Sequence, residues 1–264
     1  MRGLSWRILR DPPSTPAWNM AVDEGLARTL RSGEGVLRIY RWRQPTLSFG
    51  RNQSVRNRYD PDAFGPLGVG VVRRPTGGRE VLHDRELTYA VVLPVDELGG
   101  VRALYRLVNE GLMDGLRSLD VAAELADPAG RMASLESGAC FLDPAGGEVQ
   151  VGGRKIVGSA QRRFGPALLQ HGSLLLGQPS VQLSALLDPA AAVADVSRVE
   201  HGGVGLAEVL GRPVSFGRVA AAVEAGLAGA LGGSWARGEL RADEDREARR
   251  LRGRYEAMGW TWSR

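Results

Sequence analysis

Apolar residues along the 264-residue chain repeat with a helical period in some stretches and with an extended period in others. The first helical stretch runs from Met20 to Leu30 and follows a capping sequence, Ser-Thr-Pro, at residues 14–16. A second apolar stripe predicts a helix over residues 101–119. Beyond residue 216, VAAAVEAGLAGAL and DEDREARRLRGRYEAM predict two more helices, the first small and apolar and the second charged.

Short runs of β-branched and aromatic residues predict strands between the first two helices. These runs cover residues 36–42, 46–50, 69–74 and 87–93, and we expect them to form one mixed sheet. Two hairpins follow, EVQVGGRKIVGSAQ with a Gly152–Gly153 turn and FGPALLQHGSLLL. Alternation along the first hairpin predicts Lys155 and Val157 on one face, with Arg154 and Ile156 on the other. The predicted fold class is therefore α/β (α+β), a mixed β-sheet with flanking helices.

Composition places the chain among ordinary globular proteins, because 43% hydrophobic residues are enough for a core. A single cysteine excludes an internal disulfide and any multi-cysteine metal site, which fits a reducing compartment. The stretch MRGLSWRILRDPPS lacks the apolar core of a signal peptide, and no apolar run is long enough to span a bilayer. We expect a cytoplasmic protein that does not bind membranes.

The formal net charge of +4, with a pI near 9.7, would permit nucleic-acid binding. No helix-turn-helix, RNP or zinc-finger pattern accompanies that charge, so we expect no nucleic-acid partner. A basic surface suits an acidic protein partner equally well.

Several strong motifs are missing from the sequence: the P-loop, the dinucleotide-binding GxGxxG, HExxH and GxSxG. The three histidines, His83, His171 and His201, are isolated and do not have the spacing of a metal site. We therefore expect no metal.

The stretch RRPTGGREVLHD, residues 73–84, carries two adjacent glycines after a predicted strand. Backbone N–H groups there could approach an oxygen-rich ligand closely, and Arg73, Arg74 and Arg79 would add positive charge. A plain turn between two strands explains the glycines equally well.

Cys140 is the only cysteine and Lys155 the only lysine among 34 basic residues. A lone cysteine is usually a small buried hydrophobe. Its glycine- and proline-rich surroundings instead predict a loop in which the thiol can react, and a nearby ammonium would favour the thiolate. On these grounds alone, Lys155 is either a surface hairpin residue or part of a site.

A resemblance to a known family rests on five segments in a fixed order. They are NMAVDE (19–24), RWRQPTLSFGRNQ (41–53), RRPTGGREVLHDRELTYAVV (73–92), GRKIVGSAQRR (153–163) and LLQHGSLLL (168–176). Together they resemble the lipoate and octanoate protein ligase and transferase family, and the closing GRYEAMGWTWSR is similar to that family's C-terminal helix and tail. The resemblance implies a single catalytic domain over residues 1–264, like that of biotin protein ligase, with a C-terminal helical extension from about residue 216.

Within the family, Cys140 in its ACF context is similar to the nucleophile of the octanoyl-carrier-protein:protein octanoyltransferases. The resemblance implies that Cys140 takes octanoate from octanoyl-acyl carrier protein as a thioester during lipoate biosynthesis. A lysine of a lipoyl domain, such as the glycine cleavage H protein, would then take it as an amide, without a cofactor. Arg79 stands where the ligases of the family usually keep a third glycine, which favours the transferase branch.

The resemblance also implies roles for further residues. Lys155 matches the lysine that contacts the acyl carbonyl, where its charge would stabilise an oxyanion. The substrate-binding residues implied are Arg73, Gly77, Gly78, His83, Gly158, Ser159, Ala160 and His171.

Three other functions remain open from the sequence: an ATP-dependent lipoate or octanoate ligase, an amidotransferase between lipoyl domains, and a module that binds acyl carrier protein without chemistry. The group that deprotonates the attacking lysine is also open, with His83, His171 and Lys155 as alternatives. The sequence does not identify the acceptor protein or the oligomeric state.

Overall fold

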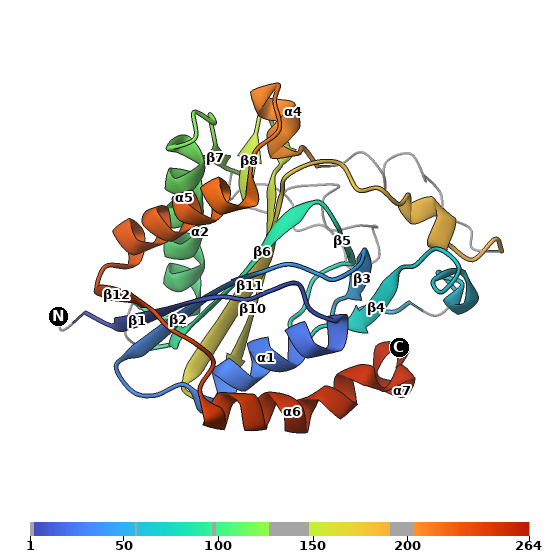
Figure 1. Cartoon of the computed structure of the whole chain (residues 1–264), viewed down its shortest axis with the longest axis horizontal. Helices are drawn as coiled ribbons and strands as arrows, with labels where there is room; N and C mark the ends of the chain where they lie inside the picture. Colours follow the sequence, from blue (N-terminus) through green and yellow to red (C-terminus); the bar gives the residue numbers. More distant parts are fainter. Residues whose placement is uncertain (1–2, 56, 97–98, 127–147, 191–202, 264) are drawn as a thin grey trace.

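A six-stranded mixed sheet forms the centre of the computed structural model, which describes residues 3–55, 57–96, 99–126, 148–190 and 203–263. The strand order is β10-β11-β6-β2-β1-β12 (Figure 1). The strands are β1 Ser5–Arg10, β2 Glu34–Tyr40, β6 Glu86–Pro94, β10 Val157–Phe164, β11 Ala167–Leu175 and β12 Ser234–Arg237. Strand β1 runs parallel to β2 and β12, whereas β6 is antiparallel to β2 and β11, so the predicted mixed sheet is confirmed.

Helices cover both faces of this sheet (Figure 1). One face carries α1 (Pro16–Thr29) and α6 (Ala242–Glu256), and the other carries α2 (Val101–Arg117) and α5 (Phe216–Leu231). Alternate residues of β2 serve the two cores: Val36 and Tyr40 pack with α1 and α6, whereas Leu37 and Ile39 pack with α2 and α5. The four helices predicted from periodicity are therefore confirmed.

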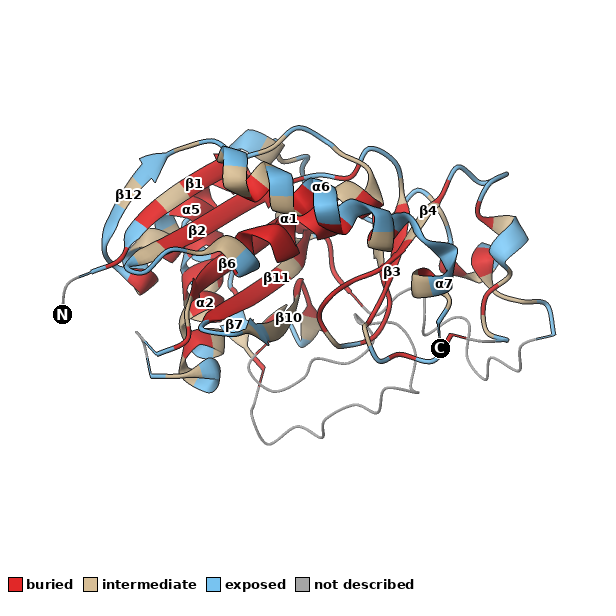
Figure 2. Cartoon of the chain, turned by 90° about the horizontal axis from the view of Figure 1, so that it is seen from below, coloured by how far each residue is buried: buried red, intermediate tan, exposed pale blue. Residues whose placement is uncertain are grey.

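Two details of these helices follow from the sequence. The Thr15 side chain accepts a hydrogen bond from the backbone N–H of Trp18, and Pro16 occupies the first turn, as expected for this cap. The segment from residue 216, expected as a C-terminal extension, contributes α5 to one face, β12 to the sheet edge and α6 to the other face. In Figure 2, α6 shows pale blue residues on its outer side, whereas strands β2, β6 and β11 of the central sheet are mostly red with burial.

The expectation of one sheet is wrong for two of the predicted strands. Strands β3 (Thr46–Phe49) and β4 (Gly70–Arg73) join β5 (Val81–His83) in a separate three-stranded sheet of order β4-β3-β5. Leu47, Phe49 and Val71 of these strands pack in a third small core that includes Tyr59 and Phe64, whereas Val72 packs in the core of α1 and α6. Periodicity identifies a strand but not its partner, and this core depends on residues far along the chain.

A third sheet holds the first predicted hairpin, with order β7-β8-β9. Its strands are β7 Glu124–Leu125, β8 Val149–Val151 and β9 Arg154–Lys155, and the other short elements are α4 Leu206–Leu210, α7 Met258–Thr261 and the 3-10 turns Pro61–Ala63 and Leu183–Leu186. Gly152 and Gly153 have φ of 54° and 73°, which confirms the predicted turn.

The expected alternation of faces fails just beyond this turn. The strand is interrupted at Ile156, where the chain leaves the third sheet and enters the central one as β10. As a result Ile156 and Val157, expected on opposite faces, pack in the same core, and Lys155 is buried as well. The second predicted hairpin, β10 to β11 with its turn at Gly165, is confirmed.

Candidate active site

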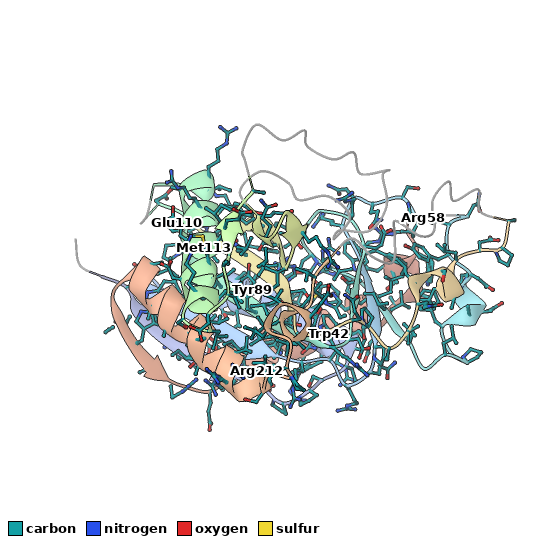
Figure 3. All side chains as sticks on the ribbon, turned by 90° about the horizontal axis from the view of Figure 1, so that it is seen from above. Trp42, Arg58, Tyr89, Glu110, Met113 and Arg212 are labelled. Atoms are coloured by element: carbon teal, nitrogen blue, oxygen red, sulfur yellow. The ribbon has the colours of Figure 1, made fainter. Side chains whose placement is uncertain are left out.

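A pocket lies where the central sheet meets the small β4-β3-β5 sheet. It encloses about 440 Å³ of space, part of it open to solvent. Its lining residues are Met20, Tyr40, Trp42, Ser48, Arg74, Gly78, Val81, His83, Thr88, Gly158, Ser159, Ala160, His171, Gly172 and Ser173. Trp42, a residue of this lining, and Tyr89, which contacts the lining residue Ser159, are buried residues labelled in Figure 3.

Six of the residues expected at the site line this pocket: Gly78, His83, Gly158, Ser159, Ala160 and His171. Arg73, Gly77 and Lys155 do not line it. Cys140 lies outside the described residues. The role of each residue stays a prediction, but the structure brings together segments that are far apart in the sequence.

The glycine turn after β4 has a conformation that requires glycine at one position. Gly78 has φ of 89°, in the region that disfavours side chains. The turn also packs tightly against Gly50. A Cβ atom built on Gly50 would lie 1.7 Å from the Gly78 carbonyl oxygen. Arg74 fixes the turn by donating from Nη2 to the carbonyls of Gly77 and Arg79, at 2.8 and 2.6 Å.

The two adjacent arginines at this turn have different surroundings. Arg73 donates from Nη1 to the carbonyls of Gly50 and Gln53, at 2.7 and 2.8 Å, and from Nε to the carbonyl of Thr261 at 3.0 Å. It therefore ties the C-terminal tail to the loop after β3, and Arg74 is the arginine that lines the pocket. Strict alternation along the predicted strand 69–74 places the two arginines on opposite faces, so it could have predicted their different surroundings.

His83 is held in the pocket by a chain of hydrogen bonds. The β3–β5 register pairs it with Thr46, so it shares a face with Ser48, two residues along β3. Its Nε2 lies 2.7 Å from the Ser48 hydroxyl, and its Nδ1 lies 2.7 Å from Oε1 of Glu86. Its ring stacks on Trp42, with centroids 4.3 Å apart. Sequence reasoning assigned no role to Ser48 or Glu86, although the i, i+3 spacing of His83 and Glu86 in HDRE was visible.

Glu86 is a buried carboxylate that accepts hydrogen bonds from several side chains. The donors besides His83 are Trp42 Nε1 at 3.1 Å, the Thr88 hydroxyl at 2.6 Å and the Ser173 hydroxyl. Burial alone would raise the pKa of Glu86, but His83 and these hydroxyl donors outweigh burial and hold it below its usual value. Glu86 is therefore ionised at neutral pH.

His171 forms a second chain of hydrogen bonds beside the pocket. Its Nε2 lies 2.6 Å from the Thr76 hydroxyl and its Nδ1 lies 2.9 Å from Oδ2 of Asp23. Asp23 also accepts from Arg38 Nη1 at 2.7 Å and from the Tyr40 hydroxyl at 2.8 Å. Burial lowers the pKa of His171 more than Asp23 raises it, so the ring is neutral at neutral pH. Asp23 lies in the NMAVDE segment, but its role was missed.

A polar network reaches the pocket from the α2 side of the sheet. The Ser159 hydroxyl lies 2.7 Å from the Tyr89 hydroxyl and donates to Oδ1 of Asn109 at 3.3 Å. Burial raises the pKa of Tyr89 to about 12, so the phenol stays protonated. The opposing Gly172 leaves room for this network, because a Cβ atom there would lie 2.7 Å from Tyr89 Cε1.

Lys155 is a buried residue and not a surface one. Its side chain is 1% exposed, and its Nζ donates to Oε1 of Glu148 at 2.7 Å. The backbone of Lys155 is also held, since its carbonyl accepts from the N–H of Val204 at 2.9 Å. The ammonium is thus fixed three residues before Gly158, the first β10 residue of the pocket lining.

Within the described residues, no group of three His, Cys, Asp or Glu side chains is arranged to hold a metal ion. None of the described helices combines the length and the apolar character needed to cross a membrane.

Comparison with known proteins places this fold and pocket in a family. Residues 15–228 match the family model described as the lipoyl protein ligase A/B catalytic domain, so the chain belongs to that family. The chain is 42% identical over 270 residues to a protein of Kyrpidia tusciae named octanoyltransferase LipM, with 98% of each chain covered. It is 38% identical over 267 residues to a protein of the same name from Moorella thermoacetica, with 97% of each covered.

A solved structure shares the fold over nearly the same length. It is a bi-partite lipoate protein ligase from Thermoplasma acidophilum, from a study that also covers its E2 lipoyl domain. The TM-score is 0.79 at 23% identity, with 99% of this chain and 96% of that chain covered. The predicted fold class and the predicted family are both confirmed.

Proposed function

We propose that this chain is an octanoyltransferase of lipoate biosynthesis that moves an octanoyl group from octanoyl-acyl carrier protein to a lysine of a lipoyl domain. The observation that carries the proposal is the similarity, over nearly the full length of both chains, to proteins named octanoyltransferase LipM. Those proteins are acyltransferases by name, and their identity of 38 to 42% is well above that to the ligase structure.

The chemistry of the proposed reaction needs no activated cofactor. In the first step the Cys140 thiolate attacks the carrier thioester, and the carrier thiolate leaves. In the second step a lysine amine attacks the Cys140 thioester, forming an amide and returning the cysteine. Thioester exchange is nearly balanced and amide formation from a thioester is downhill, so the donor supplies the driving force.

The residues that line the pocket support this proposal. Met20, Val81 and Ala160 offer apolar surface for an acyl chain, while the glycines at 78 and 158 keep the backbone accessible. The acceptor part of the proposal draws on the solved lipoate protein ligase, whose study also covers its E2 lipoyl domain. Glycine cleavage H protein is our specific candidate for the acceptor.

The test combines the purified enzyme, octanoyl carrier protein and an apo lipoyl domain, with no nucleotide present. We expect the mass of the lipoyl domain to rise by one octanoyl group. A strict requirement for ATP and free octanoate or lipoate would contradict the proposal and identify a ligase. Transfer from an octanoylated lipoyl domain but not from the carrier would identify an amidotransferase.

A further inference from the structure

We propose that His83, oriented by Glu86 and reached through the Ser48 hydroxyl, takes the proton that the acceptor lysine must lose before it attacks the acyl group. The inference rests on the proposed octanoyl transfer and adds to it the identity of the general base. His83 Nε2, Ser48 and Glu86 form a continuous hydrogen-bonded relay at the pocket wall, with both links 2.7 Å long.

The hydrogen-bond pattern fixes the direction of the relay. Trp42 Nε1 can only donate, and it donates to Oε1 of Glu86, so that oxygen is an acceptor. In a neutral His83 the proton is then on Nδ1, facing the same oxygen, and Nε2 is left as the acceptor for Ser48. A histidine in this form is ready to receive a proton at Nε2.

Charge distinguishes His83 from His171. Among the described residues, the ion pairs of Asp23 include the permanent cation Arg38 at 2.7 Å, whereas Glu86 pairs only with His83. A proton gained by His83 would therefore complete a buried ion pair with Glu86. His171 instead shares Asp23 with Arg38, which also pairs with Asp11 at 2.6 Å, and burial lowers the pKa of His171 despite Asp23.

Lys155 is a weaker alternative as the base. Its Nζ is a hydrogen-bond donor to Glu148 at 2.7 Å, which is the role of an ammonium that already holds its protons. It is also absent from the pocket lining that contains Ser48 and His83. A fixed positive charge suits oxyanion stabilisation better than proton removal.

The proposed step balances in protons and bonds. The acceptor ammonium gives one proton to the Ser48 oxygen while the Ser48 hydroxyl passes its own proton to His83 Nε2. The free amine attacks the thioester carbon, the carbon–sulfur bond breaks, and a second nitrogen proton neutralises the departing thiolate. His83 then returns its proton to solvent, so one proton is released in each turnover.

The experiment separates the two half-reactions in His83→Gln. The variant is first loaded from octanoyl carrier protein and then mixed with an apo lipoyl domain or, separately, with hydroxylamine, which is neutral at pH 7 and needs no base. We expect loading and hydroxylamine discharge at wild-type rates, and transfer to the lipoyl domain slowed about a hundredfold, the lower range for losing a general base.

Two further variants distinguish loss of the base from a folding defect caused by the substitution at His83. Glu86→Gln keeps the shape of the side chain but not its charge, and we expect the same selective loss of transfer to the lipoyl domain. Glu224→Gln removes a partly buried carboxylate at the far edge of the sheet, where it pairs with Arg10 and Arg237, and serves as the control with unchanged transfer.

Other results would overturn the assignment. Transfer to the lipoyl domain at the wild-type rate in both pocket variants would exclude His83 as the base. An equal loss with the lipoyl domain and with hydroxylamine would assign His83 and Glu86 to holding the acyl group. A wild-type enzyme that never acquires an octanoyl group would instead overturn the proposed function, which keeps the two failures distinct.

Discussion

At the scale of single residues, Lys155 shows how burial changes the meaning of a sequence signal. Its rarity among basic residues pointed to a site, and the hairpin context left a surface position open. The structure places it at 1% exposure against a carboxylate that is itself nearly buried. Glu148, its partner, lies across a glycine turn, and nothing in the spacing of the two residues predicts that contact.

We expect Lys155→Ala to slow octanoyl transfer about a hundredfold, because one charge-assisted oxyanion contact is lost. The burial of the pair adds a second effect that the sequence did not predict. Removing one partner of a buried ion pair typically costs about 3 kcal/mol, so the midpoint of urea unfolding should also fall.

A double variant separates the two effects of Lys155. Lys155→Met with Glu148→Gln removes both charges, so unfolding should return toward the wild-type midpoint while transfer stays slow. The neighbouring Arg154→Ala, which is partly exposed, is the control that should change neither measurement. Transfer at the wild-type rate in a stable double variant would contradict the role of Lys155.

At the scale of elements, periodicity predicted each long helix of the described residues and both hairpins, because each has an apolar stripe or a glycine turn of its own. It did not predict β1 or β12, which are short and pair in parallel with strands far away in the sequence. Periodicity also did not predict which strands belong to which sheet. Periodicity also did not predict the close approach of α2 and α5. That approach depends on glycines in both helices.

We expect two glycines of α5 to respond in opposite ways to alanine. A Cβ atom at Gly226 would lie 2.1 Å from the Gly111 carbonyl of α2, so Gly226→Ala should destabilise the fold by about 2 kcal/mol through overpacking. A Cβ atom at Gly229 meets nothing within 4 Å, so Gly229→Ala should stabilise the helix by about 0.5 to 1 kcal/mol. Urea unfolding of both variants checks this, and an equal shift would show that α2 and α5 do not pack this closely.

At the scale of the whole molecule, the pocket depends on the junction between two sheets. The central sheet supplies Ser159 and His171, and the small sheet supplies Ser48 and His83. The resemblance in the sequence named three of these four residues, all but Ser48, because the motifs preserve residue types in order. It did not reveal the carboxylates beneath the histidines, since Asp23 and Glu86 meet their partners only once the sheets are assembled.

The most direct test of the account asks whether the chain carries an octanoyl thioester. Enzyme mixed with octanoyl carrier protein, without acceptor, should gain the mass of one octanoyl group, and hydroxylamine should remove it. Cys140 is the only thiol in the chain, so a thioester can form at no other side chain, and Cys140→Ala should never acquire the adduct. A wild-type enzyme that stays unmodified, or a Cys140→Ala variant that still transfers octanoate to a lipoyl domain, would contradict the account.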